Sequence, residues 1–164
     1  MVSPELIRRY KYFSSISIEQ LNMLASIAEE VEYEPGHYFH QEGEDIGKVY
    51  IVVEGEISLV TSLPQQDKEV VINTMGTGDV FGWTSLLPPY TAGSGAKSVS
   101  KCKLLEVGSA ELREKFQADY KFGYLMMIKF APISRERLDA VVLESLAGQA
   151  EVGPGKSMEV GIGP

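Results

Sequence analysis

The sequence predicts a mainly β fold with flanking helices: an antiparallel jelly roll, or double-stranded β-helix, with helices before it and a long helix after it. Apolar residues recur at helical spacing near both ends of the chain, whereas from about residue 31 to residue 107 they alternate with polar ones, as in half-buried strands. Short glycine-containing turns, such as "EPG", "EGE", "GTGD" and "GSG", divide that middle part. Several short strands at this spacing are typical of Greek-key jelly rolls.

The chain has 164 residues, enough for one domain with a substantial core and too few for two of ordinary size. Its net charge of −8 excludes a general electrostatic attraction to nucleic acid. No apolar run is long enough to span a membrane, and the N-terminus lacks the apolar segment of a signal peptide, so we expect a cytoplasmic protein with no membrane partner. The single cysteine, Cys102, cannot form an internal disulfide or hold an iron–sulfur cluster.

Two helices are expected before the roll. The segment "PELIRRYKYF" predicts a short one. The next begins at Ser17, which forms a capping box with Gln20, and Ile16 and Leu21 are placed to form a hydrophobic staple. Its apolar face is predicted to carry Leu21, Leu24, Ala25 and Ala28.

Within the roll, strands are predicted in the segments "HYFHQEG", "VYIVVEGEISLVT", "EVVINTM" and "SVSKCKLLEV". Helical periodicity returns at Ser109, a predicted N-cap, with Glu111 in the first turn. Pro132 is expected to kink or break the long helix, and Ser134 to cap the part that follows. We therefore predict one domain over residues 1–146, with helices over 109–146, and a flexible glycine-rich tail over 147–164.

The spacing of particular residues in the roll resembles that of one known family. These residues are Pro35, Gly36, Glu42, Gly43, Tyr50, Gly55, Gly78, Asp79, Phe81, Gly82, Cys102, Leu104 and Leu105. With the order of helices, roll and long helix, they resemble the cyclic-nucleotide-binding domains, above all the sensor half of catabolite-activator and fumarate–nitrate-type regulators. The resemblance covers roughly residues 10 to 146 and implies the same jelly-roll fold.

The resemblance also implies a ligand site. In the family, a short helical turn after "FG" aims backbone N–H groups at the cyclic phosphate, as helix N-termini do for anions. A glutamate directly after "FG" accepts a hydrogen bond from the ribose, and an arginine further along pairs with the phosphate. The matching positions, which are the ligand-binding candidates here, are Phe81, Gly82, Trp83, Thr84, Ser85, Ala92 and Gly93.

Two of these positions depart from the family's pattern. Gly82 and Ser85 match it, but Trp83 stands where the glutamate is expected and Ala92 where the arginine is expected. No cationic residue occurs from Glu69 to Ala96. Lys97 follows five positions after Ala92, an odd offset that places it on the opposite face of a regular strand.

Tight binding of cyclic AMP or cyclic GMP in the family's usual mode is therefore not expected, and the site is left to a small anionic or aromatic ligand or to none. Trp83 has two interpretations. It is either core packing that closes an unused cavity, or a platform on which a different planar ligand stacks.

Other kinds of site find little support in the sequence. His37 and His40 are the only histidines, and their spacing places them on opposite faces of a strand, which does not suit chelation of a metal. Cys102 fits a small buried side chain better than a haem ligand. No catalytic triad or metal motif appears, so we expect neither an enzyme nor a metal site, and no cofactor is assigned.

Three functional hypotheses remain. The first is a stand-alone sensor or regulatory module; the second is a ligand-free module for dimerisation or protein interaction. The third is a transcriptional regulator of the catabolite-activator type whose DNA-binding domain is missing from this chain, so the chain alone is not expected to bind DNA. Phe122, Leu125, Met126 and either Met127 or Ile128 are expected to be exposed, as more apolar surface than one roll covers, which favours a homodimer through the C-terminal helix. Leu138, Val142 and Leu146 follow at helical spacing.

Overall fold

The computed structural model describes residues 1–63 and 65–151. The chain divides into two compact units, residues 1–131 and residues 132–164. The first unit contains all the strands and the candidate ligand residues. Within residues 1–63 and 65–151, no helix is both long and apolar enough to cross a membrane.

The two predicted N-terminal helices are α1 (Pro4–Arg8) and α2 (Ile18–Ile27). The predicted capping box is confirmed, because the Gln20 amide N–H donates to Ser17 Oγ and the Ser17 N–H donates to Gln20 Oε1. The prediction was wrong for Ala28. Its extended backbone ends α2 and begins the first strand, so it lies outside the helix.

Two antiparallel four-stranded sheets form the roll. The first contains, in spatial order, β1 (Ala28–Tyr33), β8 (Cys102–Gly108), β3 (Lys48–Glu54) and β6 (Val80–Phe81). The second contains β2 (Tyr38–His40), β7 (Gly95–Ser98), β4 (Ile57–Leu63) and β5 (Lys68–Met75). The predicted jelly-roll class is confirmed; the sequence patterns did not separate β1 or β6 as strands, and one predicted run covers both the end of β7 and β8.

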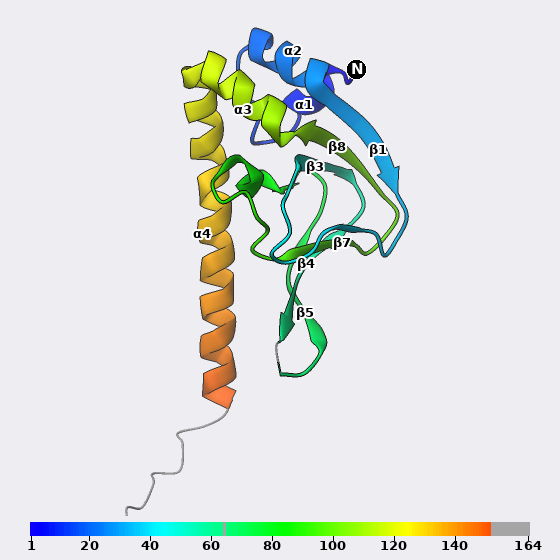
Figure 1. Cartoon of the computed structure of the whole chain (residues 1–164), viewed down its shortest axis with the longest axis vertical. Coiled ribbons are helices and arrows are strands. Elements are labelled where there is room, and N and C mark those ends of the chain that lie inside the picture. The colour runs from blue at the N-terminus through cyan, green and yellow to red at the C-terminus, as the bar shows by residue number, and fades with distance from the viewer. Residues whose placement is uncertain (64, 152–164) are drawn as a thin grey trace, which may run out of the picture. The chain divides into compact units, whose positions relative to one another are not determined.

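The core of the roll lies between the two sheets. It contains Tyr50, Val52, Phe81, Cys102 and Leu104 from the first sheet and Ile57, Leu59, Met75 and Ala96 from the second. Figure 1 shows α1, α2 and the helix α3 (Ser109–Ala118) gathered at one end of the roll, beside β8 and β3. A second apolar cluster lies there, formed mainly by Ile7, Phe13, Leu24, Val49, Ile51, Val107, Leu112, Met126 and Phe130.

α3 begins one residue earlier than predicted. Gly108 is the N-cap, and Ser109 is the first helical residue and makes no capping bond. The prediction of Ser109 as N-cap was therefore wrong, because its buried hydroxyl is hydrogen-bonded to the hydroxyl of Ser85 instead. Glu111 does lie in the first turn, as predicted.

The long C-terminal helix is α4 (Tyr120–Glu151), which contains Pro132. The predicted break is not seen: proline withholds one N–H, but the helix continues on both sides of it. α4 includes residues 147–151 of the predicted tail, and the rest of that tail, 152–164, lies outside the described residues.

The predicted exposure of the first half of α4 was wrong in part. Phe122 and Met126 are buried within the first unit, whereas Ile128 is exposed. Phe122 meets the ring of Phe116 edge-on at 5.1 Å between centroids, so α3 covers part of this apolar surface. The prediction counted apolar residues without allowing for the helices packed at that end of the roll.

Candidate functional site

The segment from Phe81 to Gly93, here called the cassette, contains all the candidate ligand residues. Phe81 ends β6, and its buried ring stacks on Tyr50 at 4.6 Å between centroids and 10° between planes. Gly82 follows with a φ of +73° and caps the 3₁₀ helix η1 (Trp83–Leu86). The cassette then passes through a cis peptide bond between Pro88 and Pro89.

Gly82 is required by both its conformation and its surroundings. L-residues other than glycine rarely adopt this positive φ. A Cβ atom at this position would lie 2.5 Å from the carbonyl oxygen of Lys48 and 3.1 Å from the Tyr50 ring. The turn that opens the cassette therefore depends on glycine at this position.

Trp83 is only 3% exposed. Its ring lies 6.1 Å from that of Phe130 on α4, within the first unit, and Phe130 in turn meets Tyr12 and Phe13 edge-on. The indole thus joins the apolar cluster at the helical end of the roll. Its Nε1 is buried and has no hydrogen-bond partner among the described residues.

Ala92 is held by its backbone at the far end of the cassette. Its N–H donates to the Glu44 carbonyl at 2.8 Å, and its carbonyl accepts from the Gly43 N–H at 2.8 Å. The alanine side chain is buried and carries no charge. The neighbouring Gly93 is exposed, and a Cβ atom added to it would have nothing within 4 Å, so the surroundings do not require glycine there.

A cation reaches the cassette from outside it. Arg113 on α3 donates from Nη1 to the Ser85 carbonyl at 2.7 Å, and its guanidinium lies over the Tyr90 ring at 4.5 Å. Sequence reasoning missed Arg113 and Tyr90. The available signal was the spacing of Arg113 four residues after Ser109, which places both on one face of a helix.

A buried carboxylate lies on the strand next to Tyr50, the tyrosine whose ring approaches Gly82. Glu106 on β8 is 3% exposed, forms an ion pair with Lys48 and accepts a hydrogen bond from the Tyr33 hydroxyl. Burial, and then the charge of Glu106, raises the pKa of Tyr50 to about 12. Burial, followed by the hydrogen bond to Glu106, also raises the pKa of Tyr33. Both tyrosines therefore stay protonated at neutral pH and act as hydrogen-bonding or packing groups.

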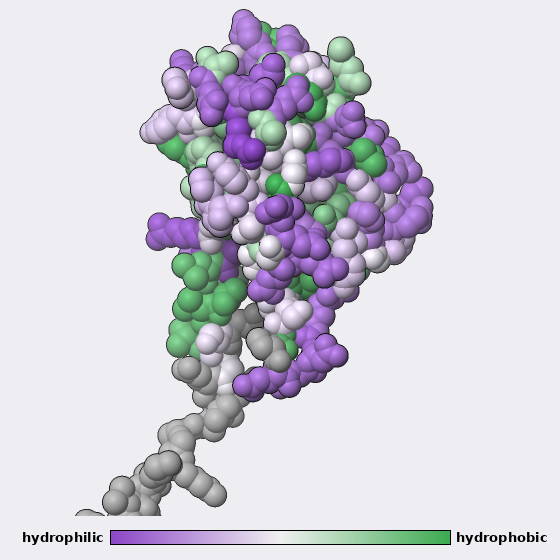
Figure 2. Space-filling model, in the orientation of Figure 1, coloured by the Kyte–Doolittle hydropathy of each residue, from purple (hydrophilic) through white to green (hydrophobic). Residues whose placement is uncertain are grey.

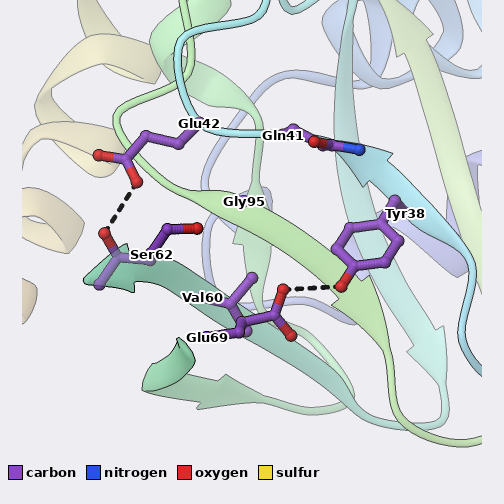
Figure 3. Close-up of a pocket in the computed structure, with 8 residues that line it drawn as sticks. Tyr38, Gln41, Glu42, Val60, Ser62, Glu69 and Gly95 are labelled. Carbon is purple, nitrogen blue, oxygen red and sulfur yellow. Dashed lines mark hydrogen bonds between the residues drawn. The ribbon is translucent and has the colours of Figure 1, made fainter. Parts of the chain in front are cut away.

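Lys97 lies away from the cassette, where it pairs with Glu69 beside a cavity of about 250 Å³ formed by β2, β4, β5 and β7. Figure 3 shows Tyr38 directed at Glu69 there, and the Tyr38 hydroxyl donates to Glu69 Oε2 at 2.7 Å. The hydrogen bond from Lys97, and then that from Tyr38, lowers the pKa of Glu69. On the other wall, Glu42 accepts a hydrogen bond from the Thr61 hydroxyl at 2.8 Å.

The structure thus places Phe81, Gly82, Trp83, Thr84 and Ser85 on one continuous turn, while Ala92 and Gly93 follow at the other end of the loop. Their role in binding a ligand stays a prediction. His37 is exposed and His40 is buried. Within the described part of the chain, no group of three histidine, cysteine or acidic side chains is arranged to hold a metal ion.

Solved structures of other proteins have a similar fold. A protein from Geobacter metallireducens named for cyclic nucleotide binding has a TM-score of 0.75 and 29% identity, over 84% of this chain and 99% of its own. The regulatory subunit of a cAMP-independent protein kinase A from Trypanosoma brucei, solved as a triple mutant with cAMP, has a TM-score of 0.68 and 18% identity, over 87% of this chain and 49% of its own.

Among curated proteins, the CRP-like cAMP-activated global transcriptional regulator of Mycobacterium tuberculosis is 24% identical over 109 residues. The match covers 66% of this chain but 48% of the regulator, so the chain spans about half the length of that relative. The family model for the cyclic nucleotide-binding domain matches residues 30–119, which is more than half of the chain. The chain therefore belongs to the cyclic nucleotide-binding domain family.

Proposed function

We propose that the chain is a non-enzymatic regulatory module of this family that does not bind cyclic AMP or cyclic GMP tightly in the family's usual mode. The observation that carries the proposal is the burial of Trp83 against Phe130. At the position where the resemblance implies a ribose acceptor, the side chain is an indole already used in the apolar cluster. Ala92, at the position of the implied arginine, supplies no cation.

The expected loss of affinity is large. Hydrogen bonds to charged groups contribute about 1.5–3 kcal/mol each. Losing two of them weakens binding by roughly 3–6 kcal/mol, or ~100-fold to ~10,000-fold. The trypanosome subunit, which shares this fold, is part of a cAMP-independent kinase, and one of the three substitutions in the form solved with cAMP introduces an arginine. That protein is an example of this fold in a kinase described as independent of cAMP.

We expect cyclic AMP or cyclic GMP at low micromolar concentration to leave the melting temperature of the protein unchanged. A ligand at a hundred times its Kd stabilises by about 2.7 kcal/mol, a shift that thermal unfolding resolves readily. Emission of Trp83, the chain's one tryptophan, provides a second readout of the same titration. A rise of several degrees with either nucleotide would overturn the proposal.

A second candidate function is binding of a small planar ligand at Trp83. The buried Nε1–H favours it, because a buried donor without an acceptor is costly and a ligand oxygen or nitrogen would satisfy it. Titration with a panel of metabolites, followed by Trp83 emission and by melting temperature, distinguishes a ligand-binding sensor from a ligand-free interaction module. A saturable shift with an aromatic acceptor-bearing compound supports the sensor, and no shift across the panel supports the ligand-free interaction module.

We also propose that the module forms a homodimer through α4. Figure 2 shows an apolar patch on the second half of that helix, where the exposed residues are Leu138, Val141, Val142, Leu143 and Leu146. An amphipathic or apolar helix surface of this kind favours pairing with another helix, and a two-fold dimer is the commonest oligomer. With a net charge of −8, the chain is not proposed to bind DNA by itself.

The double variant Leu138→Asp/Val142→Asp is expected to turn a dimer into a monomer in analytical ultracentrifugation. These side chains are 62% and 48% exposed, so the variant should fold. Val71→Asp, at a comparably exposed apolar side chain on β5, is the matched control and should leave the dimer intact. A monomeric wild-type protein, or a dimer that survives both changes on α4, contradicts this mode of pairing.

A further inference from the structure

Arg113 contacts two separate parts of the cassette. On one side its Nη1 donates to the carbonyl of Ser85 in η1, at 2.7 Å. On the other side its guanidinium covers the ring of Tyr90, which lies beyond the cis Pro88–Pro89 bond, at 4.5 Å. A single side chain from α3 therefore joins the two sides of the loop.

The charge of Arg113 suits the first contact. Ser85 belongs to the last turn of η1, where carbonyl groups carry partial negative charge. A charge-assisted hydrogen bond at this position is stronger than one between neutral groups. The hydroxyls of Ser85 and Ser109 are also hydrogen-bonded to each other, so the start of α3 and Arg113, one turn further on, both bind the same cassette residue.

The second contact supports a conformation that tyrosine rarely adopts. Tyr90 has a φ of +66°, in the left-handed region that favours glycine. Its carbonyl accepts from the Ile46 N–H at 3.0 Å, and its ring is covered by Arg113. Tyr90 is 38% exposed, so its ring lies at the surface and the guanidinium covers one face of it.

We propose that Arg113 is a positioning residue that holds the cassette closed when no ligand is bound. The proposal rests on the proposed function, and it adds how the loop keeps its shape without a cyclic nucleotide. The guanidinium of Arg113 binds the Ser85 carbonyl of η1. It does not occupy the N-terminal end of η1, where the family resemblance implies that an anion would bind. The conformation of the cassette is then set by α3 through this side chain.

The test compares Arg113→Met with Lys115→Met in the full chain without any ligand. Lys115→Met is the matched control, because it removes the same charge from the same helix. Among the described residues, the Lys115 side chain forms no hydrogen bond or ion pair with the cassette. Acrylamide quenching of Trp83 emission reports opening of the cassette. Hydrogen exchange of the Leu87, Tyr90 and Ala92 amides, which donate to Thr84, Leu87 and Glu44, reports it residue by residue.

Arg113→Met is expected to accelerate exchange of these amides about tenfold and to increase quenching of Trp83, while exchange in β8 stays unchanged. Arg113→Lys keeps the charge but not the planar group, so its exchange rates and quenching should fall between those of wild type and of Arg113→Met.

Tyr90→Leu removes the ring that Arg113 covers and tests the same contact if Arg113→Met fails to fold. It should also accelerate hydrogen exchange of the Ala92 amide. Unchanged exchange and quenching in Arg113→Met or Tyr90→Leu, or an equal effect of Lys115→Met, would show that the inference is wrong. Because no nucleotide is present, this result is independent of whether wild type binds cyclic AMP.

Discussion

The double variant Trp83→Glu/Ala92→Arg is expected to bind cyclic AMP at least ~100-fold more tightly than wild type, because it restores both charged hydrogen-bond partners. Glutamate at position 83 would accept from the ribose, and arginine at position 92 would pair with the phosphate. Gly82 and the 3₁₀ turn already provide the backbone for the glutamate, and the hydrogen bonds of Ala92 with Gly43 and Glu44 fix the backbone for the arginine. Isothermal titration calorimetry measures the gain directly.

The same variant should be less stable than wild type when no ligand is present. Removing the Trp83 ring leaves a gap beside Phe130, and losses of a large buried aromatic side chain cost about 3–5 kcal/mol. Cyclic AMP should then raise the melting temperature of the variant but not that of wild type. Ala92→Arg alone is the control, since it supplies the cation while Trp83 stays in the cluster. A folded double variant without a cyclic-AMP-dependent shift would show that the cassette backbone no longer has a phosphate-binding shape.

Gly82→Ala should destabilise the protein by about 2–4 kcal/mol, because the left-handed backbone and the clash with the Lys48 carbonyl both oppose a Cβ atom. For a chain of this size that corresponds to a fall of roughly 5–15 °C in melting temperature. Gly93→Ala, in the same loop but with nothing within 4 Å of the added carbon, should change stability by less than about 0.5 kcal/mol. Equal melting temperatures for the two variants would contradict the geometry described at Gly82.

Much of the fold could be predicted from the sequence because its signals are local. The Ser17–Gln20 capping box and the alternating strands depend on residues close together in the chain, and the structure confirms them. Ala28 was assigned to the wrong element because its apolar side chain fits a helix face and a strand equally well. Phe122 was expected to be exposed because its cover, Phe116 on α3, comes from tertiary packing.

The candidate site likewise contains residues that a local motif predicts and residues that only tertiary packing brings to it. Gly82 and Trp83 could be recognised from a motif within the cassette, and so could the absence of a cation at Ala92. Arg113 could not be found by that route, because it contacts Ser85 from another element. Ser109 was misread for the same reason: a serine at the start of a helix usually caps it, and here a long-range hydroxyl contact replaces the cap.

Different residues determine the shape of the turn at Gly82 and its chemistry. The shape depends on one glycine and on the Lys48 carbonyl of β3, whereas the chemistry depends on the side chains at positions 83 and 92. Substitutions at those two positions can therefore change the ligand chemistry while the turn at Gly82 keeps its shape, although each change at position 83 also alters the packing against Phe130. A lineage can abandon one small molecule and later acquire another, or a protein partner, on an inherited loop of nearly constant form.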